Sequence, residues 1–163
     1  MGWWNTKVRQ AVRHLGGRVS PAEREALAGW LTAAQLRLFD AMHPADQRHG
    51  LDVAAALRDG GRDDPELLLA ALLHDCSKGP GVRLPHRVAW SLGEHYGEPV
   101  VRVFARLPGF AEAFARLRRH ADDSADMALA AGCSERTASL IRYQADPRDP
   151  DAGVALRLAD EAS

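Results

Sequence analysis

Four side chains of the metal-ligand type lie on or at the ends of apolar helical stretches of this sequence. They are two histidines, His49 and His74, and two aspartates, Asp75 and Asp160. Two imidazoles and two carboxylates form a mixed nitrogen and oxygen set, which suits Mn, Fe, Zn, Co or Ni better than calcium or a thiolate site. A bound ion would remove the cost of burying the carboxylates and would make a water acidic enough to attack near neutral pH.

Lys78 stands three residues after Asp75, and its ammonium is a point charge suited to phosphate oxygens. Taken singly, each of these residues is more often structural, because a buried histidine is usually a hydrogen-bonded core residue and a terminal aspartate is usually solvated. Their combination, in this order on helices, favours a metal site with a phosphate-binding cation beside it.

The adjacent His74-Asp75 pair follows seven consecutive apolar residues, Leu67 to Leu73. Asp64 is a good N-cap and Pro65 suits the first helical position, so a helix is predicted to begin near residue 65. Because this helix is apolar on nearly every face, we expect it to be central and buried. Its C-terminal turn would then carry the titratable pair into the interior.

His49 and Asp160 lie on two other predicted helices. Residues 44–58 place His49, Val53 and Leu57 at four-residue steps, so His49 points with the apolar face into the core. The last helix ends at Asp160, and its apolar face carries Val154, Ala155, Leu158 and Ala159.

Capping and stop signals predict further helices along the chain. Their expected ranges are 3–15, 21–31, 33–42, 85–96, 99–106, 110–131 with a bend near residues 120–123, and 135–144. No segment shows sustained two-residue alternation, so the predicted fold class is all-α. We assign residues 1–31 to an N-terminal helical extension and residues 32–163 to the main domain, in one compact unit overall.

The composition restricts the classes of partner. The chain has 163 residues, and 21 Lys and Arg against 22 Asp and Glu create no overall field for a nucleic-acid polymer. The two cysteines, Cys76 and Cys133, argue against a disulfide scaffold and fit a reducing cytoplasm. The apolar run at 67–73 is too short to span a bilayer. We therefore expect a cytoplasmic protein with no membrane partner, and leave its oligomeric state open.

These motifs give the sequence a resemblance to the HD-domain phosphohydrolase superfamily, whose pattern is a histidine, an adjacent His-Asp pair and a distant late aspartate. The resemblance covers about residues 32–163, and it is most specific over Ala70–Gly79. It implies hydrolysis of phosphoesters, mostly on nucleotides. It also implies one divalent metal ion, with Mg²⁺ possible beside the transition metals, held by His49, His74, Asp75 and Asp160.

Residues 117–125 resemble the segment that supplies an extra histidine, here His120, in two-metal members of the superfamily. Those members include cyclic-dinucleotide phosphodiesterases and symmetrical diadenosine-tetraphosphate hydrolases. They usually have a later histidine where this chain has Tyr143 or Gln144. Neither is a good divalent-metal ligand, so the chain departs from the two-metal pattern. His120 is left open as a lone second-metal ligand, a general acid or base, a phosphate contact or a structural histidine.

The expected function is that of a metal-dependent phosphohydrolase acting on a nucleotide or a related small phosphoester. Asp75 would help to hold the ion, while Lys78 and His120 would stabilise the phosphate oxygens. Two alternatives stay open. One is a non-catalytic regulatory module that binds metal and nucleotide. The other is a helical interaction domain in which His74 and Asp75 form only a buried, hydrogen-bonded pair.

Overall fold

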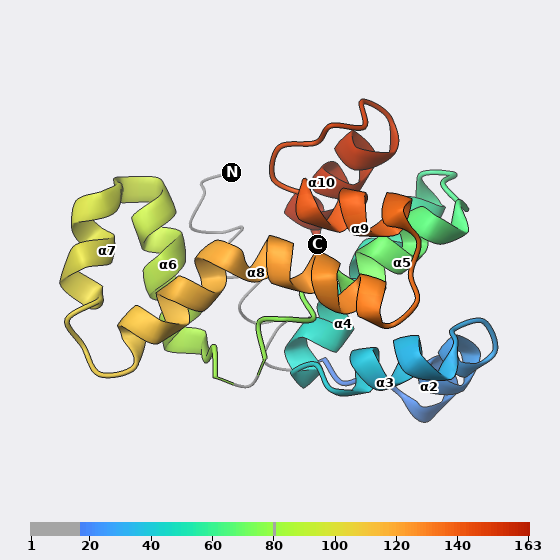
Figure 1. Cartoon of the computed structure of the whole chain (residues 1–163), viewed down its shortest axis with the longest axis horizontal. Coiled ribbons are helices and arrows are strands. Elements are labelled where there is room, and N and C mark those ends of the chain that lie inside the picture. Colours follow the sequence, from blue (N-terminus) through green and yellow to red (C-terminus); the bar gives the residue numbers. More distant parts are fainter. Residues whose placement is uncertain (1–16, 80) are drawn as a thin grey trace.

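The computed structural model describes residues 17–79 and 81–163, and all regular elements in these ranges are helices (Figure 1). This confirms the all-α prediction, while the helix expected at 3–15 lies outside the described residues. In chain order the helices are α2 (Pro21–Ala28), α3 (Ala33–Asp40), α4 (Pro44–Asp59), α5 (Pro65–Leu73), α6 (Leu84–Tyr96), α7 (Glu98–Phe104), α8 (Phe110–Ala130), α9 (Glu135–Arg142) and α10 (Ala152–Ala162).

Local capping decides where several of these helices begin and end. The Asp64 carboxylate accepts a hydrogen bond from the backbone N–H of Glu66, so α5 begins at Pro65 as predicted. Helix α2 ends at Ala28, three residues before the predicted end, with Gly29 as its C-cap, and Thr32 is extended and caps α3. Helix α8 continues without interruption through residues 120–123, and the bend expected there stays a prediction.

Helix α5 is the centre of the main hydrophobic core. Each residue of Leu67–Leu73 is buried, as predicted, with at most 9% of its surface exposed. Side chains from α2, α3, α4, α8, α9 and α10 pack around it, and Leu27 of α2 belongs to the same core. Helix α5 has only nine residues, and no helix in the described ranges is long and apolar enough to cross a membrane.

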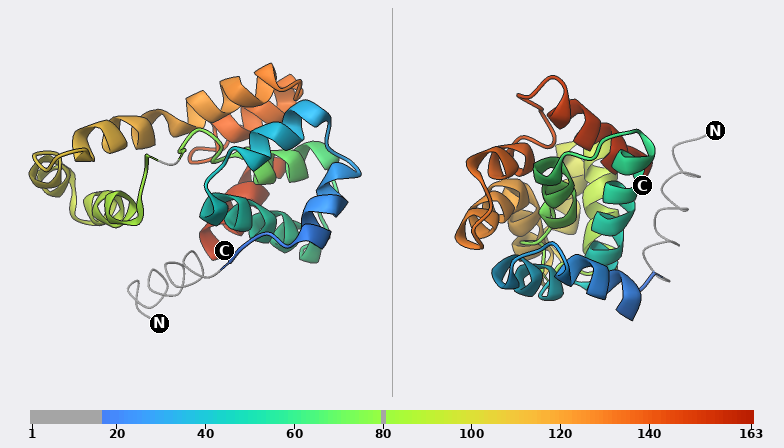
Figure 2. Two further views of the ribbon diagram at one scale, coloured as in Figure 1. Left: turned by 90° about the horizontal axis from the view of Figure 1, so that it is seen from below. Right: turned by 90° about the vertical axis from the view of Figure 1, so that its right-hand side faces the viewer.

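A second, smaller hydrophobic cluster lies between α6, α7 and the first half of α8. Its buried members are Val82, Ala89, Val101, Phe114 and Leu117. Figures 1 and 2 show α6 and α7 beside one end of α8, away from the other helices. Helix α8 therefore joins the two clusters, since its second half packs into the main core through Ala125 and Ala128.

Candidate metal centre

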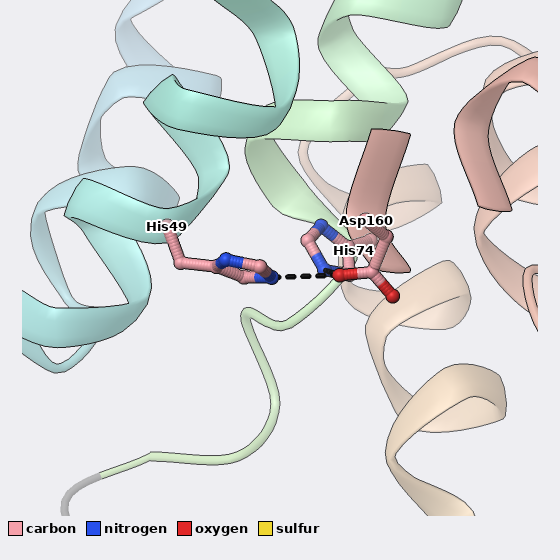
Figure 3. A group of neighbouring side chains, drawn as sticks. All are labelled: His49, His74 and Asp160. Atoms are coloured by element: carbon pink, nitrogen blue, oxygen red, sulfur yellow. Dashed lines mark hydrogen bonds and ion pairs between the residues drawn. The ribbon is translucent and has the colours of Figure 1, made fainter. Parts of the chain in front are cut away.

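Three of the four predicted metal ligands come together from distant parts of the chain. His49 lies on α4, His74 directly follows α5 and Asp160 lies on α10 (Figure 3). Nε2 of His49 is 2.7 Å from Oδ1 of Asp160, and Nε2 of His74 is 3.5 Å from the same oxygen. One ligand atom from each residue lies within 4.8 Å of the other two, so the group could hold a metal ion.

Gly50 allows α4 to approach α5 closely enough for this meeting. A Cβ atom at position 50 would lie 2.8 Å from the backbone oxygen of Leu72, a distance that real side chains do not adopt. Only glycine fits such a close backbone crossing. The rings of His49 and His74 consequently lie with their centroids 5.3 Å apart. Gly50 was not among the residues predicted from the sequence, although its place beside His49 was a usable signal.

The imidazole of His74 is oriented by the backbone. Its Nδ1 lies 2.9 Å from the carbonyl oxygen of Ala71, and because a carbonyl only accepts, Nδ1 is the donor. Nε2 therefore faces the carboxylates of Asp75 and Asp160, at 3.6 and 3.5 Å. Burial opposes protonation of this imidazole, but the two carboxylates outweigh it and raise the pKa of His74 to about 9. This backbone hydrogen bond is the arrangement that orients metal-ligating histidines.

The fourth predicted ligand, Asp75, lies beside the other three. Its Oδ2 forms an ion pair of 2.5 Å with Nζ of Lys78, which holds the pKa of Asp75 well below its ordinary value despite burial. Its Oδ1 is buried and has no hydrogen-bond partner among the described residues. A buried carboxylate oxygen without a partner is costly, and a bound cation would compensate it. The donor set thus fits a divalent metal, and Asp75 stays a predicted ligand.

The turn that carries Asp75 and Lys78 is fixed against α8 by two serines. The hydroxyl of Ser77 donates to the backbone oxygen of His120 at 2.9 Å, and the backbone N–H of Ser77 donates to Oγ of Ser124 at 3.1 Å. These contacts hold the Lys78 side chain, which is 17% exposed, at the edge of the centre. Neither serine was identified from the sequence, because hydroxyls at such spacing occur throughout helical proteins.

His120 and Gln144 also lie beside the predicted metal ligands. Nδ1 of His120 donates to the backbone oxygen of Leu117 at 2.6 Å, which leaves Nε2 3.7 Å from Oδ1 of Asp75 and 3.4 Å from Nε2 of Gln144. Burial and the charge of Lys78 lower the pKa of His120. The lowered pKa favours the neutral imidazole, whose lone pair is then on Nε2.

Of the two residues at the expected position of a further histidine, only Gln144 contacts the centre. Its buried amide nitrogen lies 3.4 Å from the backbone oxygen of His74, in addition to its contact with His120. Tyr143 instead packs its ring under the guanidinium of Arg148, at 3.7 Å. Gln144, two residues after α9, thus contacts both histidine-bearing segments through an amide, which is a poor ligand for transition metals.

A buried ion pair behind His49 was also missed by sequence reasoning. The guanidinium of Arg87 on α6 donates to both carboxylate oxygens of Asp46 on α4, at 2.6 and 2.7 Å. Its Nε also donates to the backbone oxygen of Val82 at 3.2 Å, and Asp46 is fully buried. This ion pair links the first turn of α6 to α4, and Asp46 lies about one helical turn before His49 on α4.

Comparisons with protein-family models, with curated proteins and with solved structures find no match for this chain. The chemistry of the centre is therefore the only indication of function in the described residues. Within the centre, His49, His74 and Asp160 are the residues whose ligand atoms all lie close together.

Proposed function

We propose that this protein is a metal-dependent phosphohydrolase that acts on a nucleotide or a related small phosphoester. The observation that carries the proposal is the convergence of His49, His74 and Asp160 from three separate segments to within 4.8 Å. Their nitrogen and oxygen donors suit Mn, Fe, Co, Ni or Zn. When bound, such an ion supplies an acidic water and offsets the charge of a phosphate.

The neighbouring side chains have the properties that phosphate chemistry requires. The partly exposed ammonium of Lys78 can bind non-bridging phosphate oxygens. Neutral His120 can accept a proton at Nε2 or donate one when protonated. Asp75 positions both groups, since Oδ2 holds Lys78 and Oδ1 faces His120. A phosphoester at the centre would thus meet a fixed cation and a proton-transfer group held by one carboxylate.

A specific observation supports a second candidate, a non-catalytic module that binds metal and nucleotide. The amide of Gln144 lies against His120 where a further imidazole is expected in two-metal proteins. The ammonium of Lys78 also donates a hydrogen bond to Oδ2 of Asp75. A centre with one ion, with Gln144 where a histidine is expected and with Lys78 bound to Asp75, could hold a nucleotide without cleaving it.

Metal analysis and a substrate screen distinguish these functions. Protein purified without chelator is analysed for metals, and metal-free protein is reconstituted with Mn, Fe, Co, Ni or Zn and assayed against nucleotides and aryl phosphoesters. We expect about one ion per chain, and hydrolysis that is lost in His49→Ala. Nucleotide binding without turnover under every ion would favour the regulatory module. Failure to bind any metal would overturn both proposals and favour the helical interaction domain.

A further inference from the structure

Arg87 connects the smaller hydrophobic cluster with the helix that carries His49. Its own helix, α6, packs mainly against α7 and α8. The guanidinium nevertheless extends to α4, where Nη1 and Nη2 donate to the two carboxylate oxygens of Asp46 at 2.6 and 2.7 Å. Asp46 is fully buried, and the side chain of Arg87 is 17% exposed. A paired contact of this kind fixes the direction of approach as well as the distance.

Asp46 transmits this contact to the metal centre. It lies three residues before His49, and side chains at this spacing are neighbours on one side of a helix. On the other side of His49 in the chain, Gly50 brings α4 against the backbone of Leu72. Helix α4 is therefore held both before and after His49. A rotation of α4 that moved His49 would have to break the paired contact between Asp46 and Arg87.

The same guanidinium is bound to the loop that follows Lys78. Nε of Arg87 donates to the backbone oxygen of Val82 at 3.2 Å, and the backbone N–H of Val82 donates to the carbonyl oxygen of Gly79 at 3.4 Å. Gly79 directly follows Lys78, and Val82 is buried in the smaller cluster. Arg87 thus has hydrogen bonds to the helix of a metal ligand and to the loop beside the proposed phosphate-binding lysine.

The guanidinium stays charged in this position. Burial disfavours the cation, but the hydrogen bonds and the charge of Asp46, together with the charge of Asp75, raise the pKa of Arg87. Asp75 is a predicted metal ligand, so Arg87 lies within electrostatic range of the centre. A buried ion pair gives little net stability, and an apolar pair of similar volume often stabilises a fold equally well. An apolar pair, however, cannot reproduce three directed hydrogen bonds.

We propose that Arg87 is a positioning residue of the metal centre, which fixes the placement of His49 relative to Lys78. It acts through Asp46 on one side and through Val82 on the other, without touching the ion or the substrate. The inference rests on the proposed function for the metal ion and for the role of Lys78 alone.

The test measures metal affinity and stability in the same variants. Co²⁺ is titrated into metal-free protein and followed by its visible absorption, and stability is measured by urea unfolding. Asp46→Leu/Arg87→Met leaves no buried charge without a partner, so it should keep most of the wild-type urea midpoint. It should nevertheless bind Co²⁺ about tenfold more weakly, the loss typical of removing a group that orients metal ligands. Arg87→Lys keeps the charge but not the paired geometry and should also bind more weakly.

Val101→Ala is the matched control. It removes apolar contacts from the same smaller cluster without changing the ion pair. We expect a lower urea midpoint and an unchanged affinity for Co²⁺. Wild-type affinity in Asp46→Leu/Arg87→Met, or a loss of affinity that follows the loss of stability in all variants including Val101→Ala, would overturn the inference.

A second measurement separates this inference from the proposed function. Nitrogen NMR of the histidine rings, recorded on metal-free protein, reports the contact between His49 and Asp160. We expect the His49 signals to change in Asp46→Leu/Arg87→Met but not in Val101→Ala. If the wild type binds no Co²⁺ and these signals change as expected, the proposed function fails and the positioning of His49 stands. If Co²⁺ binds but neither its affinity nor these signals change, only the positioning inference fails.

Discussion

Nε2 of His49 lies 2.7 Å from Oδ1 of Asp160, although 111 positions separate the two residues in the sequence. This contact links α4 to α10 beside His74, which directly follows α5 (Figure 3). The hydrogen bonds from both histidines hold the pKa of Asp160 below its ordinary value in spite of burial. Asp160 is therefore an ionised carboxylate beside two imidazoles, and these are donor groups that a divalent ion can bind.

Asp160→Asn should weaken metal binding by at least about a hundredfold, because an amide oxygen carries no charge and binds transition metals poorly. The measurement is metal content after dialysis against a series of buffered metal concentrations. Asp151→Asn is the control, since Asp151 is also next to α10 but pairs with Arg62 at the surface. Full metal retention in Asp160→Asn would remove this residue from the centre.

Gly50→Ala should destabilise the fold by about 1–3 kcal/mol, because the new Cβ would overlap the backbone oxygen of Leu72 unless α4 moves away. The same movement would separate His49 from His74 and weaken metal binding. Urea unfolding and metal titration measure the two effects. In Gly60→Ala, at the end of the same helix, the nearest contact would be 3.3 Å, so both effects should be much smaller. Equal effects in the two variants would contradict the close-crossing argument.

The elements that could be predicted from the sequence are those with local causes. Helix α5 is one example, since Asp64 and Pro65 define its start and the continuous apolar run of Leu67–Leu73 requires burial. The inward direction of His49 follows equally from its four-residue spacing with Val53. Such patterns identify a helix and the face that it buries.

The partners across the fold were not predictable in this way. Asp46 and Arg87 are 41 positions apart, and Ser77 and Ser124 are 47 apart, so no periodicity connects them. Periodicity gives the face of a helix but not the neighbour that meets it. The position of Asp75 beside the three-residue group, held by Lys78, likewise depends on the turn after α5.

Breaking the buried Asp46–Arg87 pair should cost about 3–5 kcal/mol of unfolding free energy, because the remaining charge would be buried without a partner. We expect this loss in Asp46→Leu and in Arg87→Met. The double variant should recover most of it, since neither charge remains. Denaturant unfolding of the four proteins gives the coupling energy. Additive losses would show that the two side chains do not act as a pair.

The Glu23–Arg48 pair should make stability depend on acid pH. Hydrogen bonding to Arg48 lowers the pKa of Glu23 from 4.5 to about 2. A lowered pKa in the folded state stabilises above pH 4.5, and this contribution is lost as the pH falls towards 2. It should stay below about 1 kcal/mol because Glu23 is largely exposed. The unfolding free energy of wild type minus that of Glu23→Gln should therefore shrink from pH 6 to pH 3. A constant difference would contradict the pairing.

Lys78→Ala should leave the metal bound while lowering kcat/KM about tenfold or more, because the phosphate would lose one charge-assisted contact. The substitution also removes the main charge that keeps the pKa of Asp75 low, so the measurements are made at alkaline pH, where the carboxylate stays ionised. Lys78→Arg keeps the charge and serves as the control, with a smaller loss expected. Metal content and steady-state kinetics are measured together. Loss of metal in Lys78→Ala would assign Lys78 to the support of Asp75 rather than to phosphate binding, and unchanged kinetics would remove it from the site.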